Sequence, residues 1–336
     1  MPGAANPVLR VRNLCVDIQV PGGTLHAVRD TSFEVSRGET LAIVGESGCG
    51  KTMTALSVMR LLPRRATLFA EELTLDGVSL TELSEREISD LRGDRIGMIF
   101  QDPMTSLNPV YRIGDQLEEI YLRHGKGTRV EARQRAHHLL DRVGITNAEA
   151  RLSQYPHELS GGLRQRMMIA MALMCEPALI IADEPTTALD VTVQAQILGL
   201  LAEVRREFNT AMILITHDLG VVARAADRVA VMYAGRIVET GTATEVFSAP
   251  AHPYTRGLID CIPHPGKTER GARLGAIPGI VPSLIGDLEG CLFRNRCAFA
   301  ENRCATFDNV LSPAGQGHEY RCLLPPDKVG RAMVGS

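Results

Sequence analysis

The chain has 336 residues, 45% of them apolar, which suffices for one large α/β domain and an appended segment. Its 36 basic and 39 acidic side chains give a net charge of −3. This near balance argues against a nucleic-acid-binding protein, which usually carries a basic surplus.

Membrane insertion and export are not expected from the sequence. The longest apolar candidate, Met167–Ala182, is interrupted by Glu176 and Pro177 and falls short of the ~18 apolar residues that a membrane helix needs. The segment Met1–Val11 lacks the apolar core of a signal peptide. We therefore expect a cytosolic protein, in which the eight cysteines do not form a disulfide framework.

The spacing of apolar residues predicts strands first and then an alternation of helices and strands. The expected N-terminal strands are Leu9–Val11, Leu14–Val20, Thr31–Val35 and Thr40–Val44, with a turn at Pro21–Gly23. Helices are expected at Lys51–Leu62, 84–93 and 128–143, and strands at Leu179–Ala182, Ala211–Thr216 and Arg228–Tyr233. This alternation predicts an α/β fold with a mainly parallel sheet.

Two departures from this pattern suggest domain limits. Residues 101–177 are rich in helical patterning and interrupt the alternation, so we expect an inserted helical subdomain. After about residue 248 prolines become frequent and the periodicity fades, which marks a boundary. The predicted parts are a core of residues 8–100 and 178–248, the insert of residues 101–177, and a C-terminal domain of residues 249–336.

A phosphate-binding loop is predicted between the fourth strand and the first helix. Gly45–Thr52 fits the pattern G-x-x-x-x-G-K-[ST] at every fixed position. Backbone N–H groups and the helix N-terminus attract phosphate, Lys51 is expected to reach the β- and γ-phosphates, and Thr52 to ligate Mg²⁺. The candidate nucleotide-binding residues of this loop are Gly45, Ser47, Gly48, Cys49, Gly50, Lys51 and Thr52.

Two acids end the predicted strand near residue 180. Asp183 is expected to hold Mg²⁺ directly or through water, and Glu184 to orient or deprotonate the attacking water. Taken alone, the Asp-Glu-Pro sequence would be interpreted as the end of a strand before a turn. The phosphate loop upstream favours the catalytic interpretation.

A third motif, Leu159–Arg166, carries the sequence Leu-Ser-Gly-Gly-Leu-Arg-Gln-Arg and resembles the signature of the nucleotide-binding subunits of ATP-binding-cassette (ABC) transporters. The segments that agree with this family in the same order are the phosphate loop, Gln101 after Ile99-Phe100, Asp183-Glu184, the turn Thr187–Asp190, and His217 within Ile215–Asp218. The resemblance covers residues 8 to about 248. It implies a P-loop NTPase (RecA-like) core with an antiparallel β subdomain and an inserted α-helical subdomain.

The resemblance also implies a head-to-tail dimer that sandwiches two ATP molecules. Ser160, Gly161 and Gly162 would face the γ-phosphate held by the partner subunit's Lys51. Ser160 is in addition a natural N-cap for a helix over residues 163–175. The remaining roles that the resemblance implies are a sensor of Mg²⁺ and water at Gln101, a γ-phosphate contact at His217, and a nucleotide-site residue at Asp190.

Two positions depart from the family pattern. Ile18 stands near the place where relatives stack adenine on an aromatic ring, and His26 is a further candidate for that contact. Cys49 stands where serine is common. A thiol beside a helix N-terminus and Lys51 is expected to have a lowered pKa, so its oxidation or alkylation would block ATP binding. The alternative is that cysteine is a tolerated small residue at this position.

Three segments resemble peptide-importer ATPases in particular, and they are Gln101–Pro109, Ala251–Arg256 and Ile277–Leu284. They imply the oligopeptide/dipeptide/nickel importer subfamily, in which two related ATPase subunits lie under two membrane permeases and an extracytoplasmic binding protein delivers the substrate. Residues 101–109 would then lie where a coupling helix of the permease docks. Without the other motifs, Ala251–Arg256 would be interpreted as a proline-bounded linker.

Four cysteines lie within the last 46 residues, at Cys291, Cys297, Cys304 and Cys322. A small cysteine-containing domain with little regular structure would gain stability from a bound metal. The spacing lacks the C-x₂-C pairs of zinc ribbons and common ferredoxins. Similarity to dipeptide-importer ATPases favours a [4Fe–4S] cluster with a structural or redox-sensing role; zinc or four free thiols are the alternatives.

Together these features predict a peripheral ATPase at the cytoplasmic face of the inner membrane that drives import of di- or oligopeptides and binds no nucleic acid. The same machinery could import nickel or another small solute. One rival is a soluble cassette ATPase acting on DNA or ribosomes, but such proteins usually carry long coiled-coil or zinc insertions, or two cassettes. The other is a regulatory iron–sulfur protein with vestigial ATPase parts, which the intact catalytic positions argue against.

Overall fold

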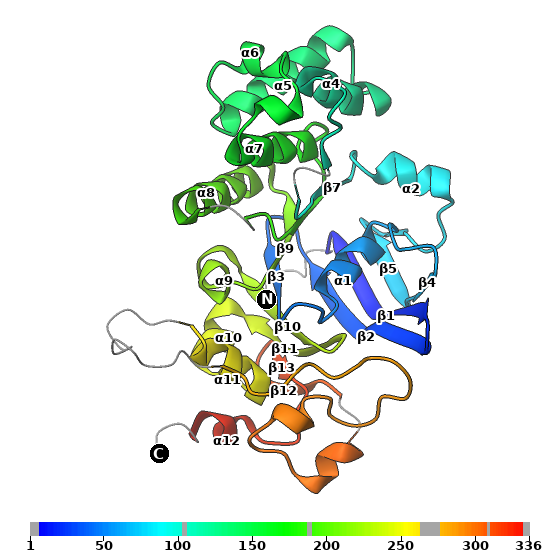
Figure 1. The fold of residues 1–336 in the computed structure, drawn as a ribbon, viewed down its shortest axis with the longest axis vertical. Coiled ribbons are helices and arrows are strands. Elements are labelled where there is room, and N and C mark those ends of the chain that lie inside the picture. Colours follow the sequence, from blue (N-terminus) through cyan, green and yellow to red (C-terminus); the bar gives the residue numbers. More distant parts are fainter. Residues whose placement is uncertain (1–6, 103–105, 187–189, 263–275, 308–309, 332–336) are drawn as a thin grey trace. The chain divides into compact units, whose positions relative to one another are not determined.

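The computed structural model describes residues 7–102, 106–186, 190–262, 276–307 and 310–331 (Figure 1). The chain divides into two compact units. Unit 1 consists of Met1–Leu9, Glu34–Glu39 and Thr74–Ile215. Unit 2 consists of Arg10–Phe33, Thr40–Leu73 and Thr216–Ser336.

Unit 2 starts with strands that the sequence largely predicts. β1 (Leu9–Val20) pairs with β2 (Gly23–Val35) and runs antiparallel to β4 (Ala66–Phe69). The turn between β1 and β2 is confirmed, and Gly22 adopts a φ of 104°, which favours glycine. β1 is one strand where two were predicted. It passes through Asn13, whose φ is 47° and whose backbone N–H donates to the Ser32 hydroxyl at 2.9 Å.

A second set of strands in unit 2 follows the order β12-β13-β11-β10-β3. Their bounds are β3 (Thr40–Val44), β10 (Arg228–Tyr233), β11 (Arg236–Thr242), β12 (Ser312–Gly315) and β13 (His318–Tyr320). β3 and β10 have the predicted bounds and are parallel, whereas β11 pairs antiparallel with β10 and with β13. β12 and β13 were not predicted, because two strands this short leave little periodicity.

The helices of unit 2 are α1 (Lys51–Val58), α9 (Leu219–Ala225), α10 (Ala243–Ser248), α11 (Pro253–Asp260) and α12 (Pro326–Arg331), with 3₁₀ turns η2 (Arg294–Arg296) and η3 (Asn302–Ala305). α1 ends before the predicted Leu62, because Arg60 adopts a left-handed φ of 52° and Pro63 follows. Val44, Val231, Tyr254 and Phe293 belong to one hydrophobic core. The chain beyond residue 248 therefore packs in the same core as β3 and β10.

Unit 1 contains three parallel strands, β7 (Ile96–Ile99), β8 (Leu179–Asp183) and β9 (Ala211–Thr216), in which β8 lies between the other two. β5 (Glu72–Leu75) and β6 (Val78–Ser79) form an antiparallel pair. All five residues of β8 are buried, as the apolar run predicts. The parallel strands in both units confirm the α/β fold class.

The helices of unit 1 are α2 (Glu85–Leu91), α4 (Ile113–Arg123), α5 (Arg129–Arg142), α6 (Ala148–Leu152), α7 (Gly161–Ala172) and α8 (Val191–Phe208), with the 3₁₀ turn η1 (Pro156–Glu158). Capping boxes start two of the predicted helices, at Ser84 with Glu87 and at Thr128 with Glu131. Residues 101–177 are rich in helices, as expected, and the domain limits stay predictions. No helix in the described part of the chain is long and apolar enough to cross a membrane.

Candidate nucleotide-binding site

The phosphate loop lies between the buried strand β3 and the first turn of α1, in unit 2. Gly45, Gly48 and Gly50 have φ values of 153°, 79° and 105°, which side chains other than glycine rarely adopt. A β-carbon on Gly50 would approach the Ala27 carbonyl oxygen to 2.5 Å. The predicted loop residues Ser47 and Thr52 are exposed, so the loop presents its polar groups to solvent next to the N-terminus of a helix.

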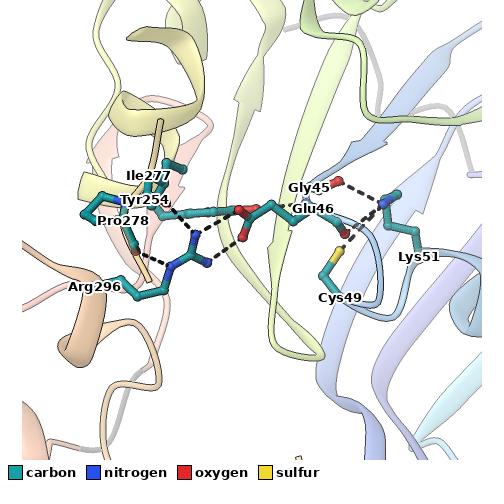
Figure 2. A network of polar contacts seen from close by, with 8 residues as sticks. All are labelled: Gly45, Glu46, Cys49, Lys51, Tyr254, Ile277, Pro278 and Arg296. Carbon is teal, nitrogen blue, oxygen red and sulfur yellow. Dashed lines mark hydrogen bonds and ion pairs between the residues drawn. The ribbon is translucent and has the colours of Figure 1, made fainter. Parts of the chain in front are cut away.

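Lys51 is folded back onto its own loop (Figure 2). Its Nζ donates to the carbonyl oxygens of Gly45 at 2.8 Å and of Glu46 at 3.0 Å, and the side chain is buried. The cation therefore already lies inside the loop, and its hydrogen bonds to neutral carbonyls can be exchanged for stronger ones to an anion.

The two predicted acids lie in unit 1, at the end of β8. Asp183 is buried, and the following residue, Glu184, has a left-handed φ of 44° with its N–H donated to the Ile215 carbonyl at 2.9 Å. Gln101 follows β7, which pairs with β8 through Ile99 and Ala182. Gln101 and Glu184 each come two positions after this Ile99–Ala182 pair, so their side chains lie close together. The Gln101 Nε2 donates to the Glu184 Oε2 at 3.2 Å.

The signature segment caps helix α7 as predicted. The Ser160 hydroxyl accepts a hydrogen bond from the Leu163 N–H at 3.4 Å, and the helix starts at Gly161, two residues earlier than expected. A β-carbon on Gly161 would meet nothing within 4 Å, and one on Gly162 would only touch Val193. Ser160 and Gly161 are exposed, so the N-terminus of α7 is open to a ligand.

The remaining nucleotide-site candidates are scattered over both units. Asp190 caps α8 by accepting from the Val193 N–H at 2.9 Å, and the turn residues 187–189 before it lie outside the described residues. His217 is exposed between β9 and α9, in unit 2. Ile18 on β1 is half-buried, and His26 on β2 contacts Asp17 through Nδ1 at 2.7 Å. Their roles toward adenine and phosphate stay predictions.

Comparison with known families decides the assignment. The sequence model of the family described as ABC transporter matches residues 28–187, and that of the oligopeptide/dipeptide transporter C-terminal region matches residues 238–304. The chain is 51% identical to a probable peptide ABC transporter ATP-binding protein of Sinorhizobium fredii, over 95% of each chain. It is 50% identical to the oligopeptide transport ATP-binding protein OppD of Salmonella typhimurium, over 98% of this chain and 97% of the relative. The chain belongs to the ABC transporter ATP-binding proteins.

Solved structures agree with this assignment. A bacterial ABC transporter cassette solved as a dimer matches with a TM-score of 0.62 and 27% identity, over 70% of this chain and 98% of its own. The same cassette in a post-hydrolysis state with ADP and phosphate matches with a TM-score of 0.61. The α/β P-loop NTPase fold of this ABC ATPase is therefore shown by its neighbours as well as by its own strands and helices.

The expected lowering of the Cys49 pKa was wrong. Its side chain has an exposed fraction of 0%. Burial raises the pKa of this thiol, and this effect outweighs the lowering by the nearby charge of Lys51. The sequence places Cys49 next to a cation and a helix N-terminus but does not reveal that the side chain points into the protein. In this ABC ATPase Cys49 is therefore a small buried residue.

The four C-terminal cysteines line one cavity of unit 2, together with Phe293 and others. Backbone N–H groups donate to the sulfur atoms of Cys297, Cys304 and Cys322, at 3.4, 3.5 and 3.4 Å. Burial raises the pKa of the Cys322 thiol to about 11. In the described residues no group of three or more His, Cys, Asp or Glu side chains is arranged to hold a metal ion. The four thiols thus line one cavity, but in the described residues their side chains are not arranged as a metal-binding group.

The sequence did not reveal that the phosphate loop contacts the C-terminal segment. Glu46 forms an ion pair with Arg296, and its backbone N–H donates to the Tyr254 hydroxyl at 2.9 Å (Figure 2). These residues are separated by more than two hundred positions. The loop pattern leaves position 46 variable, and no spacing signal connects it to the C-terminal segment.

Proposed function

We propose that this chain is the ATP-hydrolysing subunit of an importer for di- or oligopeptides. The observation that carries the proposal is a phosphate loop with a buried Lys51, in a chain about half identical over nearly its whole length to proteins named as peptide, oligopeptide and dipeptide transport ATP-binding proteins. The same machinery with nickel or another small solute as cargo is the closest alternative.

In this proposal the phosphate loop binds the triphosphate of ATP. Lys51 exchanges its two carbonyl partners for the β- and γ-phosphates, and the amides of the loop and of the first turn of α1 donate to phosphate oxygens. Ser47 and Gly48 are exposed, which leaves this part of the loop open to a ligand, and Gly50 precedes the first turn of α1. Ile18 or His26 contacts adenine.

The donor set suits Mg²⁺, because the Thr52 hydroxyl and the Asp183 carboxylate are oxygen ligands of the kind this ion prefers. When bound, the ion neutralises charge on the phosphates. Glu184 accepts a proton from the attacking water, and Gln101, hydrogen-bonded to that carboxylate, orients the water. His217 donates to the γ-phosphate, which stabilises the charge that develops there.

A second ATPase subunit, arranged head to tail, completes each nucleotide site in this proposal. The open N-terminus of α7, with Ser160, Gly161 and Gly162, faces the γ-phosphate held by the partner subunit, and Asp190 lies in the same interface. A related cassette solved as a dimer supports this arrangement. The sites therefore form fully only when two subunits close on ATP.

We further propose that the chain lies at the cytoplasmic face of the inner membrane, under two permeases that receive substrate from an extracytoplasmic binding protein. The match to the oligopeptide/dipeptide transporter C-terminal region supports this placement. Within the permease-facing segment 101–109, residues 103–105 lie outside the described residues. Co-purification with permeases rather than with DNA or ribosomes separates this function from that of a soluble cassette ATPase.

The C-terminal thiols are proposed to hold a [4Fe–4S] cluster through Cys291, Cys297, Cys304 and Cys322. Four thiols around one cavity, three of them with N–H donors to sulfur, have the chemistry that such clusters require. A cluster there would provide a cross-link and a redox-sensitive group. Purification without oxygen, followed by iron, sulfide and zinc analysis and a visible spectrum, tests this proposal. Zinc in place of iron, or four titratable thiols, would overturn it.

The transport function is tested with the whole assembly. The chain is co-expressed with the permeases and the second ATPase that co-purify with it, reconstituted in vesicles, and assayed for Mg²⁺-dependent phosphate release and peptide uptake. A Lys51→Ala assembly serves as the matched inactive control. If the parent assembly neither retains nor cleaves ATP, the proposal fails at its base, and if ATP is cleaved without peptide uptake, only the cargo assignment fails.

A further inference from the structure

An acidic side chain in a loop that binds a triphosphate requires an explanation. Glu46 is the second residue of the phosphate loop and lies between Gly45 and Ser47, where a negative charge repels an incoming anion. Its carboxylate is not left to solvent. Arg296 donates to it through both terminal nitrogens, Nη1 to Oε2 at 2.6 Å and Nη2 to Oε1 at 2.9 Å. This is the two-pronged geometry in which arginine pairs most strongly with a carboxylate.

Contacts other than the one to Glu46 also hold Arg296 in place (Figure 2). Its Nε donates to the Pro278 carbonyl at 2.9 Å and its Nη2 to the Ile277 carbonyl at 3.2 Å. The side chain is only 3% exposed, and the guanidinium carbon lies 5.8 Å from the centre of the Tyr233 ring. A guanidinium held in this way loses little conformational freedom when it pairs with Glu46. Arg296 therefore holds the phosphate loop in place, and the loop does not determine the position of Arg296.

A second contact holds the same residue from the backbone side. The Glu46 N–H donates to the hydroxyl of Tyr254, which is fully buried. The Tyr254 ring packs against Tyr233 and Phe293, with ring centres 4.6 and 5.4 Å apart. Glu46 is thus held at its amide and its carboxylate by residues from the C-terminal segment. The Glu46 carbonyl oxygen accepts a hydrogen bond from Lys51 at 3.0 Å. The position of Lys51, which is proposed to bind phosphate, therefore depends on the position of Glu46.

The segment that places Arg296 is the one that carries the cysteines. Arg296 ends η2, whose first residue donates its N–H to the Cys291 carbonyl, and Cys297 follows directly. Phe293 lines the cysteine cavity and packs on Tyr254. The path from the cysteine cavity to the phosphate loop therefore runs through a few buried side chains of unit 2.

We propose that Arg296 is a positioning residue for ATP binding: it neutralises Glu46 and holds the phosphate loop in the form that accepts a triphosphate. The proposal rests on the proposed ATP binding by the Gly45–Thr52 loop. Without Arg296 the half-buried carboxylate of Glu46 keeps its charge next to the phosphate loop and loses its anchor, so nucleotide affinity falls. Without Glu46 the loop loses the anchor but gains no repulsion, so the loss is smaller.

This charge argument predicts a rescue that a purely structural role does not. The affinity of the purified full chain for a fluorescent ATP analogue is measured for the parent, Arg296→Gln, Glu46→Gln and the double variant. Arg296→Gln should weaken binding by about tenfold or more, within the usual range of coupling between sites. The double variant should bind more tightly than Arg296→Gln, because removing the unpaired carboxylate removes the repulsion. Arg296→Lys should recover part of the affinity by restoring the charge.

Two controls distinguish a loss of the Arg296 role from a loss of ATP binding as such and from misfolding. Arg294→Gln alters the same 3₁₀ turn at a side chain that contacts the Glu289 carbonyl instead of the loop, and it should bind like the parent. Urea unfolding reports whether each variant is folded. If the parent binds and Arg296→Gln binds equally well, or if the double variant is no better than Arg296→Gln, the positioning role is overturned. If the parent itself fails to bind nucleotide, the proposed ATP binding is at fault.

Discussion

The Gln101 side-chain amide donates a hydrogen bond to the Glu184 carboxylate, with 3.2 Å between Nε2 and Oε2. Strand register explains this contact, because both residues come two positions after the paired residues Ile99 and Ala182 of the parallel strands β7 and β8. An amide in this position holds the Glu184 carboxylate at the end of β8.

Replacing the base should separate hydrolysis from binding. Glu184→Gln keeps the shape of the side chain but removes its ability to accept a proton, so phosphate release should fall by about 10²- to 10⁴-fold. ATP binding should be retained, since Lys51 and the loop amides are untouched. Phosphate release and nucleotide affinity are measured side by side. Glu203→Gln, on the exposed side of α8, is the control, and a Glu184→Gln protein with parental turnover would contradict the assignment.

Lys51 should contribute to affinity rather than to folding. Its Nζ is satisfied by carbonyl oxygens of its own loop, so these bonds are available for exchange with phosphate. Lys51→Ala should weaken ATP binding by about 10- to 100-fold, the loss of one or two charge-assisted hydrogen bonds. Calorimetric titration with Mg-ATP measures this loss. Lys328→Ala, at an exposed position of α12, should leave affinity unchanged, and equal losses in both variants would refute the role of Lys51.

Replacing Gly48 or Gly50 of the loop by alanine should lower the free energy of unfolding by different amounts. Both have positive φ, which costs an alanine about 1–2 kcal/mol. At Gly48 the added β-carbon meets nothing within 4 Å, whereas at Gly50 it approaches the Ala27 carbonyl oxygen to 2.5 Å. Gly50→Ala should therefore cost about 1–3 kcal/mol more than Gly48→Ala in urea unfolding. Equal losses of stability in the two variants would mean that the backbone near Ala27 can move away from the added β-carbon at little cost, which would contradict this prediction.

Much of this arrangement could be predicted from the sequence, because it depends on local patterns. The strands Thr40–Val44 and Arg228–Tyr233 have the predicted bounds, and Ser160 caps α7 as expected. Contacts between distant segments could not be predicted in this way. The pairing of Glu46 with Arg296 and the burial of Cys49 depend on which way a side chain points once the core has formed.

The buried state of Cys49 predicts resistance to thiol reagents. Because burial raises the pKa of the thiol, it stays protonated near neutral pH and reacts slowly. Alkylation should therefore inactivate the parent and the Cys49→Ser variant at the same rate, and the variant should keep its ATP affinity. Inactivation rates in the two proteins are compared at neutral pH. Clear protection by Cys49→Ser would restore the reactive-thiol hypothesis.

The stability of unit 2 should depend on pH through His318. Its Nε2 lies 2.8 Å from the buried Glu239 carboxylate, and this hydrogen bond raises the pKa of His318 above 6.5. The group binds its proton more tightly in the folded chain, so its stabilisation is complete below pH 6.5 and is lost as the pH rises through the folded-state pKa. His318→Gln should therefore destabilise the protein by about 2 kcal/mol under acidic conditions, the size of a hydrogen bond to a charged group, and by less under alkaline ones.

His252 adds an opposing dependence at lower pH, which the same measurement must separate. Burial lowers its pKa to about 4, so it favours folding above 6.5 and loses that contribution as the pH falls toward 4. Its Nδ1 accepts from the Tyr254 N–H at 3.0 Å, which a proton there would prevent. Urea unfolding of the parent, His318→Gln and the exposed His138→Gln is compared at pH values between about 6 and 9. His252 is present in all three proteins, so its contribution cancels in the differences between them. A difference between parent and His318→Gln that does not shrink with rising pH would show that the pair with Glu239 is not ionic.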